Sequence, residues 1–523
     1  MPARAYAIVT AALVATVFAV VLALVRPETL VHDWHGWRQA DTATIALDYA
    51  HGDLDVLRPR IAWGGDGPGY VEAELQVYTA ALALLHRLTG SAPVAAGGEW
   101  LGRALSAAAL AATAWLVWVW LRMLGLRPAA ALFGALAFAT SRGTVFLVSV
   151  QPDAFGLAAT TGALVLFTRW LHTQRLVHLA LSSLLFAIGG GIKPTFLAAG
   201  LAALATLFGH HPAGARLRAL RSSTLWIAAS LPLIAVALLL AHGASLHADY
   251  GNTFGIISGG DSKFPTLDRL ASPMQYVKLA RVGLDFGPGP LGTLGILSVL
   301  SRRRHLTSSA IAAVGGLWAA YVVVGIASMR YASEAWLGSH YHALGLLAGA
   351  VSLGMGLDGF MPLLTTRAHL RRLGAAVVFA ALALQLAVGL HHRQTAAAHW
   401  ADRELLAAAV LRSDLEKVAG PRTAASPNLP NHGVLVVIRS SVAATTETGA
   451  PNNFEDPRIF YLAGVRGWVW PSDATSVAAS LPALRARGAR YYVDATGWPF
   501  RHPEDQRWLR ENASDLGSGV FRL

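Results

Sequence analysis

The chain has 523 residues, of which 54% are hydrophobic and only 14% are charged, and this composition excludes an ordinary soluble domain. It contains no cysteine, which excludes disulfides, cysteine-ligated zinc and thiol catalysis. The formal net charge of +12 is concentrated in a few short segments, and the positions of those segments predict a membrane topology.

Hydrophobic runs long enough to cross a bilayer, which takes about 20 apolar residues, recur from Tyr6 to Leu390. We interpret the first as a retained helix rather than a cleaved signal peptide, because no clear cleavage site follows it. The run 176–208 is too long for one span and is interrupted by Lys193-Pro194, which predicts two helices meeting at a turn. About eleven spans are expected, at 6–25, 100–121, 129–150, 154–170, two within 176–208, 225–240, 291–300, 310–327, 343–357 and 375–390.

Arginines gather in alternate connections between these spans, and Asp358 is the single acid among them. The positive-inside rule places these basic connections in the cytoplasm. The rule holds only if the short apolar run 75–88 does not cross, so we expect that run to be an interfacial helix. The N-terminus is then inside, and the loops 26–98 and 242–290 lie on the extracytoplasmic face, together with everything after residue 391.

The first of these outer loops has an unusual composition. Nine of the 30 acidic residues lie between Glu28 and Glu74, mixed with His, Arg, Trp and Tyr side chains. A solvated loop that covers a helix bundle is one interpretation. A linker between helices would not need this density of acids, bases and aromatic rings, so we favour an active-site loop.

From residue 392 the composition becomes that of a soluble domain. Strands are predicted at 434–438, 489–493 and 519–523, and helices at 456–463 and 476–487. This alternation predicts a small α/β domain, so the chain is expected to divide into a membrane domain, 1–391, and an extracytoplasmic α/β domain, 392–523. No glycine-rich nucleotide fingerprint or P-loop occurs, which argues against an ATP-driven pump.

Several short motifs recur in a recognisable order, and the set covers most of the chain. They are Trp37–Ala43, Pro68–Leu85, Glu99–Arg103, Gln151-Pro152-Asp153, Lys193-Pro194, His340-Tyr341-His342 and Tyr461–Trp468. In this order they resemble the GT-C superfamily of membrane glycosyltransferases, and are similar to the protein O-mannosyltransferases and the lipid A aminoarabinose transferases. The resemblance implies a polytopic α-helical enzyme that takes a sugar from a polyprenyl-phosphate carrier and passes it to an acceptor outside the membrane.

One departure from that resemblance concerns the catalytic base. Mannosyltransferase-like members carry an adjacent Asp-Glu pair where this chain has Arg38-Gln39. Asp41 can share a helix face with Arg38, because residues three apart do so, whereas Asp33 lies before the expected helix start. We therefore predict Asp41 as the base, with Asp33 as the alternate. The competing interpretation is that Asp41 only pairs with Arg38 or caps the helix.

Transfer from a lipid phosphate also requires cations at the departing phosphate. Lys193 stands out, because a lysine inside a span costs about 2.5–3.5 kcal/mol unless it has a partner, water or a route to the interface. The predicted donor-phosphate ligands are Arg103, Lys193, Arg38, His340 and His342. Further site candidates are Asp153, Tyr341 and Glu72. The alternatives are a snorkelling lysine, a capping Asp153 and an aromatic-belt role for the two histidines.

No metal or other cofactor is predicted, although Asp33 with His32 and His35, or Asp41, could ligate a divalent ion. The expected partners are a polyprenyl-phosphate-linked sugar, the lipid bilayer and an acceptor that is protein, lipid or glycan, with no nucleic acid. The expected location is the bacterial inner (plasma) membrane. A transporter or flippase of a lipid-linked saccharide is the alternative function, followed by a non-catalytic scaffold. Transporters place their sites near the midplane and often show repeats, and neither feature is evident here.

Overall fold

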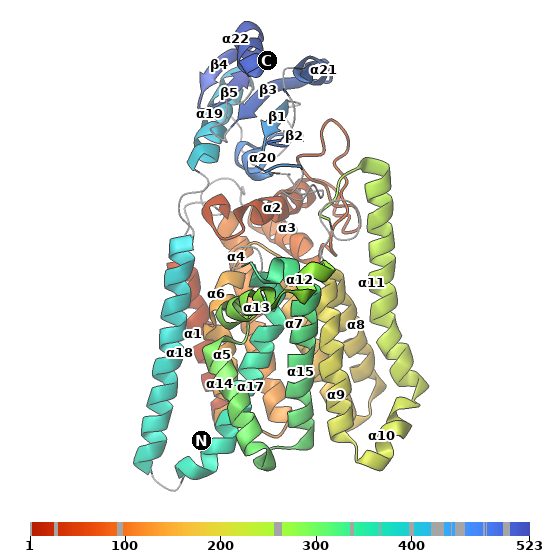
Figure 1. Cartoon of the computed structure of the whole chain (residues 1–523), viewed down its shortest axis with the longest axis vertical. Helices are drawn as coiled ribbons and strands as arrows, with labels where there is room; N and C mark the ends of the chain where they lie inside the picture. The colour runs from red at the N-terminus through yellow and green to blue at the C-terminus, as the bar shows by residue number, and fades with distance from the viewer. Residues whose placement is uncertain are drawn as a thin grey trace. The chain divides into compact units, whose positions relative to one another are not determined.

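The computed structural model describes residues 3–25, 30–90, 98–255, 264–334, 339–365, 368–396, 402–419, 434–440, 442–444, 456–473, 476, 479–494 and 503–523 (Figure 1). It forms two compact units. The helical unit comprises Met1–Arg26, Arg103–Leu238 and Lys263–Ala396, and the mixed unit comprises Pro27–Gly102, Leu239–Ser262 and Ala397–Leu523. The first predicted outer loop therefore clusters with the C-terminal region, and the boundary at 391/392 stays a prediction.

Within the described residues, seven helices are long and apolar enough to cross a membrane. They are α1 (Ala3–Leu24), α4 (Gly98–Met123), α7 (Asp153–Thr173), α11 (Ser223–Tyr250), α15 (Ser308–Ala327), α17 (Ala343–Thr365) and α18 (Ala368–Ala396). Four shorter apolar segments join them, namely α5 (Pro128–Thr140), α8 (Leu176–Ile192), η2 (Pro194–Ala199) continuing into α9 (Gly200–His210), and α14 (Gly289–Arg302). Each predicted span corresponds to one of these segments. The protein is a multi-pass helical membrane protein, as predicted, and the sidedness stays a prediction.

Two breaks in the helices have local causes. α8 ends at Ile192, Lys193 is extended with φ −153° and ψ 112°, and Pro194 opens η2, which confirms the predicted Lys-Pro turn. The predicted span 129–150 is wrong as a single helix. α5 stops at Thr140, and the Ser141 hydroxyl accepts a hydrogen bond from the Thr144 N–H to cap a new helix, α6 (Arg142–Leu147).

The predicted polar loop 242–290 is more helical than its composition suggests. α11 continues to Tyr250, beyond the expected end at residue 240, and α12 (Leu267–Ala271) and α13 (Pro273–Phe286) follow. Residues 256–263 of this loop lie outside the described residues. The remaining short helices of the helical unit are α10 (Ala213–Leu220), η3 (Arg303–His305), α16 (Met329–Ala332) and η4 (Ser339–His342).

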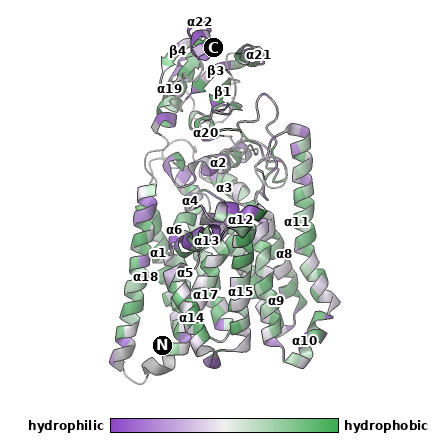
Figure 2. Ribbon diagram, viewed as in Figure 1, coloured by the Kyte–Doolittle hydropathy of each residue, from purple (hydrophilic) through white to green (hydrophobic). Residues whose placement is uncertain are grey.

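Small residues bring the helices of this unit into close contact. A Cβ on Gly292 of α14 would lie 2.4 Å from the Cα of Gly349 on α17, and one on Gly316 of α15 would lie 2.6 Å from the Cα of Ala202 on α9. Such close backbone approach is typical of helices that associate in lipid. Hydrophobic residues cover long stretches of α11 and α18, whose apolar side chains are largely exposed and suited to a lipid face (Figure 2).

The mixed unit combines short helices with one sheet. Its first segment folds into η1 (Leu30–His32), α2 (Gly36–His51) and α3 (Val77–Thr89), and α3 matches the short helix expected at 75–88. Its C-terminal part has five strands in the order β2-β1-β3-β5-β4, with β1 parallel to both β2 and β3 and the other pairs antiparallel. The strands are β1 (Leu435–Arg439), β2 (Arg466–Trp470), β3 (Ala489–Asp494), β4 (Ser514–Gly517) and β5 (Val520–Arg522).

The sequence predicted β1, β3, β5 and the helix α20 (Arg458–Ala463), and these are confirmed. The helix expected at 476–487 is shorter, as α21 (Leu481–Ala486), and residues 477–478 of that range lie outside the described residues. Four elements were not predicted, namely α19 (Asp402–Ala419), β2, α22 (Pro503–Asn512) and β4.

Candidate active site

The predicted site residues fall into two groups. Asp33, Arg38, Asp41 and Glu72 belong to the mixed unit. The helical unit holds the other predicted residues, Arg103, Asp153, Lys193, His340, Tyr341 and His342.

The turn before α2 fixes where the predicted acids lie. His35 adopts a left-handed conformation with φ 54°, and Gly36 then begins the helix so close to Val31 that a Cβ would lie 2.3 Å from its carbonyl oxygen. Asp33 precedes this turn, as predicted, and is only 6% exposed. Its Oδ1 accepts a hydrogen bond of 2.8 Å from the Trp34 N–H. Asp33 is thus a buried acid held outside the helix.

Asp41 is more deeply buried, at 2% exposed, and points from the first half of α2 to an aromatic partner. The indole Nε1 of Trp63 donates a hydrogen bond of 3.0 Å to Asp41 Oδ1. Arg38, one turn earlier on α2, forms an ion pair with Glu74. Sequence reasoning therefore missed two partners, Trp63 and Glu74.

A segment after α11 completes the surroundings of Arg38. The Arg38 guanidinium lies 4.3 Å from the ring centroid of Phe254, and that ring meets Trp63 edge-on at 6.1 Å. Glu72 is 1% exposed, and its Oε2 accepts a hydrogen bond of 2.5 Å from the Thr253 hydroxyl. The Phe254 N–H also donates to the Glu72 carbonyl at 3.1 Å. Glu72 therefore anchors this segment next to Arg38.

In the first segment of this unit, Asp48 and Asp66 also have shifted pKa values. Burial raises the pKa of Asp48, on α2, although the charges of Arg60 and Arg466 act in the opposite direction. A hydrogen bond from Arg487 lowers the pKa of Asp66. Asp48 lies seven residues after Asp41 and so shares its helix face, about 10 Å further along α2. It is an acid that the sequence did not single out.

In the helical unit, Lys193 has the partner that an intramembrane lysine requires. Its Nζ lies 2.6 Å from Asp153 Oδ1, and the two side chains are 16% and 11% exposed. The ammonium also lies 4.8 Å from the ring centroid of Tyr341. Three of the predicted residues therefore meet at the end of α8, the start of α7 and η4. An ammonium has three donors, so the ion pair with Asp153 leaves two for a ligand.

The two histidines of η4 differ in their surroundings. His342 is fully buried, with Nε2 2.8 Å from the Ala332 carbonyl and Nδ1 2.9 Å from the Tyr321 hydroxyl. Both ring nitrogens are thus engaged by the protein, and the predicted phosphate contact of His342 stays a prediction. His340 packs against Tyr341, with ring centroids 4.4 Å apart, beside the Lys193 ammonium.

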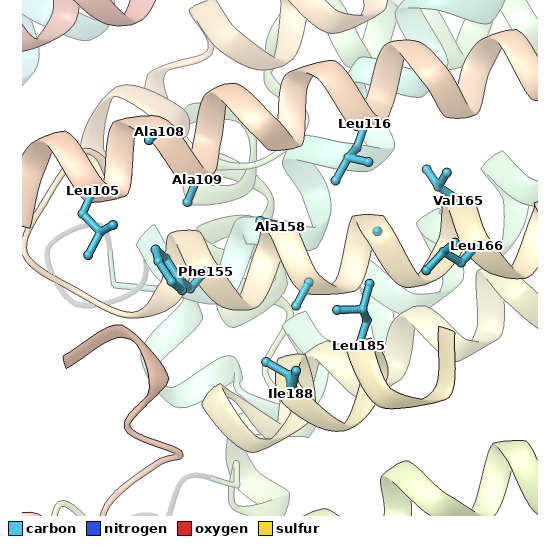
Figure 3. A pocket seen from close by; sticks show the side chains of 12 residues that line it. Leu105, Ala108, Ala109, Leu116, Phe155, Ala158, Val165, Leu166, Leu185 and Ile188 are labelled. Atoms are coloured by element: carbon cyan, nitrogen blue, oxygen red, sulfur yellow. The ribbon is translucent and has the colours of Figure 1, made fainter. Parts of the chain in front are cut away.

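An apolar groove of about 580 Å³ lies between α4, α7 and α8 (Figure 3). Leu105 and Phe155 lie toward one end, and Leu116, Val165 and Leu166 toward the other. Leu105 is two residues from Arg103, and Phe155 is two residues from Asp153, which is about 3 Å along each helix axis. Arg103 is itself 7% exposed. The groove therefore ends at the level of the charged residues.

Gln151 is a further polar residue next to Asp153, within the Gln-Pro-Asp motif. It is 4% exposed, and its Nε2 has no hydrogen-bond partner in the part of the chain that the structure describes. Leaving such a donor unsatisfied costs about 1–3 kcal/mol. The sequence motif drew attention to Asp153, and only the burial of Gln151 marks it as a candidate ligand contact.

No group of three or more His, Asp and Glu side chains within the described residues could hold a metal ion. Asp33, His32, His35 and Asp41 therefore do not form such a group there. Metal dependence stays a prediction to be tested directly.

Comparison with known proteins adds independent information. Residues 81–242 match the family model described as dolichyl-phosphate-mannose-protein mannosyltransferase. ArnT from Cupriavidus metallidurans, solved bound to undecaprenyl phosphate, is 14% identical with a TM-score of 0.54, over 98% of this chain and 97% of that one. The chain has the fold of the GT-C glycosyltransferases.

A second GT-C structure, the archaeal oligosaccharyltransferase AglB from Archaeoglobus fulgidus, was solved in complex with an inhibitory peptide and a dolichol-phosphate. It is 12% identical with a TM-score of 0.52, over 92% of this chain and 69% of that one. No curated protein matches the chain in sequence. The predicted resemblance and GT-C-like fold class are confirmed, and the enzyme class that the family match indicates is glycosyltransferase.

Proposed function

We propose that the protein transfers a sugar from a polyprenyl-phosphate-linked donor to an acceptor on the extracytoplasmic face of the bacterial inner membrane. The observation that carries this proposal is the apolar groove of the helical unit, whose lining residues Leu105 and Phe155 stand two residues from Arg103 and from Asp153, the partner of Lys193. Similar structures were solved with undecaprenyl phosphate and with dolichol-phosphate, which supports a donor of the same class.

The groove and the charges serve different purposes in donor binding. The bilayer interior is already apolar, so placing a polyprenyl chain in the groove gains little free energy and mainly fixes its position. Binding energy must then come from the head group. Charge-assisted contacts from Lys193 and Arg103 to phosphate oxygens are strong, and the N-terminus of α7 favours an anion in the same region. Gln151 supplies an uncommitted amide donor beside them.

Asp153 has a definite role in this arrangement. A lysine beside a carboxylate is held in one orientation before the donor arrives, so less side-chain entropy is lost on binding. The Tyr341 ring also packs against the Lys193 ammonium. Arg103 adds a second positive charge, so Arg103, Lys193 and Asp153 together carry a net positive charge, as binding a phosphate requires.

The transfer step itself needs a base. An acceptor hydroxyl or amine attacks the anomeric carbon, the bond from that carbon to the phosphate oxygen breaks, and polyprenyl phosphate leaves with the electron pair. Asp41 takes the acceptor proton, with Asp33 as the alternate. Arg38, oriented by Glu74 and Phe254, is the cation of the mixed unit for the departing phosphate. The C-terminal α/β domain, 392–523, selects the acceptor.

The donor can be tested with the full chain in lipid nanodiscs. Undecaprenyl-phosphate mannose carrying ¹⁴C in the sugar is the first probe, because the family match names a mannose donor. If mannose is not released, lipid-linked sugars extracted from a strain lacking the protein form the second probe. We expect the wild-type chain to consume one of these lipids. Failure to consume any lipid-phosphate sugar from that extract, in the presence of the envelope fraction as acceptor, contradicts the proposal.

A matched pair of variants tests the groove. Ala109 lines it, whereas Ala112, one turn away on α4, does not. Ala109→Phe should fill the groove and reduce consumption of the donor at least about ten-fold, which is 1.4 kcal/mol. Ala112→Phe should leave consumption unchanged. Equal effects of the two substitutions would place the polyprenyl chain elsewhere.

A further inference from the structure

We propose that Trp63 is a positioning residue for Asp41, and that strand β2 of the C-terminal sheet holds Trp63 in place. The inference rests on the proposed function, in which Asp41 is the base. It connects the region that selects the acceptor to the group that removes the acceptor's proton, through one short hairpin.

The hairpin runs from Pro59 to Val71. Its two arms pair through the Val71 N–H and the Pro59 carbonyl at 3.1 Å, and through the Ile61 N–H and the Gly69 carbonyl at 2.9 Å. Trp63 lies between these pairs and the tip, with its side chain 8% exposed. Its indole N–H donates to Asp41 Oδ1 at 3.0 Å. The hairpin therefore presents one donor to the predicted base.

Backbone hydrogen bonds attach the hairpin to β2 on both sides of Trp63. The Gly467 N–H donates to the Ala62 carbonyl at 2.9 Å, and the Gly65 N–H donates to the Gly467 carbonyl at 2.7 Å. Gly64 and Trp468 form an antiparallel bridge between the same segments. The hairpin thus extends the sheet beyond β2 by a short pairing, and its hydrogen bonds to β2 flank Trp63.

Side chains strengthen this attachment. The Arg466 guanidinium donates to the Gly67 carbonyl at 2.6 Å, and Arg487 Nε lies 3.0 Å from Asp66 Oδ2. Gly65 has φ 72°, and a Cβ there would lie 2.5 Å from the indole nitrogen of Trp468. Only glycine fits this position without shifting the hairpin or the Trp468 ring.

The chemical consequence concerns the ionised state of the base. A hydrogen bond donated to a carboxylate favours its charged form and restricts its rotation. The Trp63 hydrogen bond therefore favours the carboxylate form of Asp41 and limits its rotation, and a displacement of β2 changes both effects. An acceptor that binds the C-terminal domain can thereby affect the base without contacting it.

The test uses the pH dependence of turnover, which a purely structural tryptophan would not change. Trp63→Phe removes the indole N–H that donates to Asp41. We expect kcat to fall about ten-fold and the KM for the lipid-linked sugar to stay unchanged. The acid limb of the plot of kcat against pH should move to higher pH. Trp120→Phe, on α4, is the control. It removes a comparable hydrogen bond, which the Trp120 indole N–H donates to the Thr168 hydroxyl of α7 at 2.8 Å. An acid limb that does not move in Trp63→Phe would overturn the positioning role.

A second pair of variants tests the link to β2. Gly65→Ala should displace the acid limb as Trp63→Phe does, and the double variant should show no further displacement. Gly67→Ala is the control, because its Cβ would meet only the Gly64 carbonyl, at 3.6 Å. A wild-type profile in Gly65→Ala would overturn the link to β2.

A readout without turnover separates this inference from the proposed function. With 5-fluorotryptophan incorporated, the ¹⁹F resonance absent from Trp63→Phe belongs to Trp63. It should titrate with pH in the wild-type chain and should not titrate in Asp41→Asn. A resonance that titrates equally in both would overturn the contact. If it behaves as expected but Asp41→Asn remains active, Asp41 is not the base and only the proposed mechanism fails.

Discussion

Lys193 at the end of α8 and Asp153 at the start of α7 form an ion pair, with Nζ 2.6 Å from Oδ1, inside the helical unit. The two residues are 40 positions apart in the chain, and each ends an apolar helix. The sequence predicts that Lys193 needs a partner. It does not identify Asp153 as that partner, because several acids stand at the ends of helices. The pair predicts how substitutions at the two positions should combine.

We expect Lys193→Ala to weaken binding of undecaprenyl phosphate without unfolding the chain, because it removes a phosphate contact. Asp153→Ala should lower the free energy of unfolding by about 2–4 kcal/mol, because it leaves the partly buried Lys193 ammonium without its carboxylate. The double variant should then be more stable than Asp153→Ala alone. Thermal unfolding in nanodiscs measures the stability of each variant, and binding of undecaprenyl phosphate in nanodiscs measures its lipid affinity. Strict additivity of the stability changes would show that the ion pair contributes nothing, and unchanged lipid affinity in Lys193→Ala would remove Lys193 from the site.

The second prediction concerns the base. Asp41→Asn is nearly isosteric and keeps an oxygen to accept the Trp63 hydrogen bond. Donor binding should therefore persist, while single-turnover transfer falls about 10²–10⁴-fold through loss of the base. Asp33→Asn is the comparison, because Asp33 is also buried but lies outside α2. Normal turnover in Asp41→Asn together with an inactive Asp33→Asn would transfer the role to Asp33.

How far the sequence could go depends on the range of the interactions. The apolar runs, the Lys-Pro turn and the strands β1, β3 and β5 follow from local pattern, and all are present. The helix break at Ser141 was missed, because the apolar pattern continues on both sides of it. Ser141 followed by Arg142 and Gly143 was the available signal for a new helix start.

The contacts of the candidate site were beyond local pattern. Spacing alone placed Arg38 and Asp41 on one helix face, but Glu74 lies 36 residues from Arg38 and Trp63 lies 22 residues from Asp41. Only tertiary folding brings these partners together. β2 and β4 were missed for a different reason. β2 contains an arginine and a glycine within five residues, and β4 has no β-branched or aromatic residue.

The third prediction is the sidedness of the chain, and it exploits the absence of native cysteines. His305→Cys is exposed and lies in a basic connection, so a membrane-impermeant maleimide should label it only after permeabilisation. Asp53→Cys and Glu511→Cys, both exposed in the mixed unit, should be labelled in intact cells. Labelling of His305→Cys from outside, at the rate seen for Asp53→Cys, would reverse the topology.

The last prediction concerns the C-terminal sheet in acid. Asp414 on α19 accepts hydrogen bonds from the Tyr491 hydroxyl at 2.8 Å and from Arg522 Nε at 2.9 Å. Burial by itself raises the pKa of Asp414, but these hydrogen bonds and the Arg522 charge outweigh it and hold the pKa below its ordinary value. A carboxylate with a lowered folded pKa stabilises the fold above its unfolded pKa of about 3.9, and this contribution is lost as the pH falls through the folded pKa.

Asp414→Asn should therefore destabilise β3 and β5 at neutral pH by about 2 kcal/mol, the size of a hydrogen bond to a charged group. Part of the Arg522 contribution is screened, because that side chain is 44% exposed. The difference from wild type should shrink below about pH 4, where Asp414 of the unfolded chain begins to bind a proton while the folded chain still keeps it ionised. Hydrogen exchange of the Tyr492 and Phe521 amides in the full chain measures this stability difference. Glu511→Gln is the control, because Glu511 is an exposed acid. A difference that stays constant from pH 7 to pH 3 would mean that Asp414 acts through packing, not through its charge.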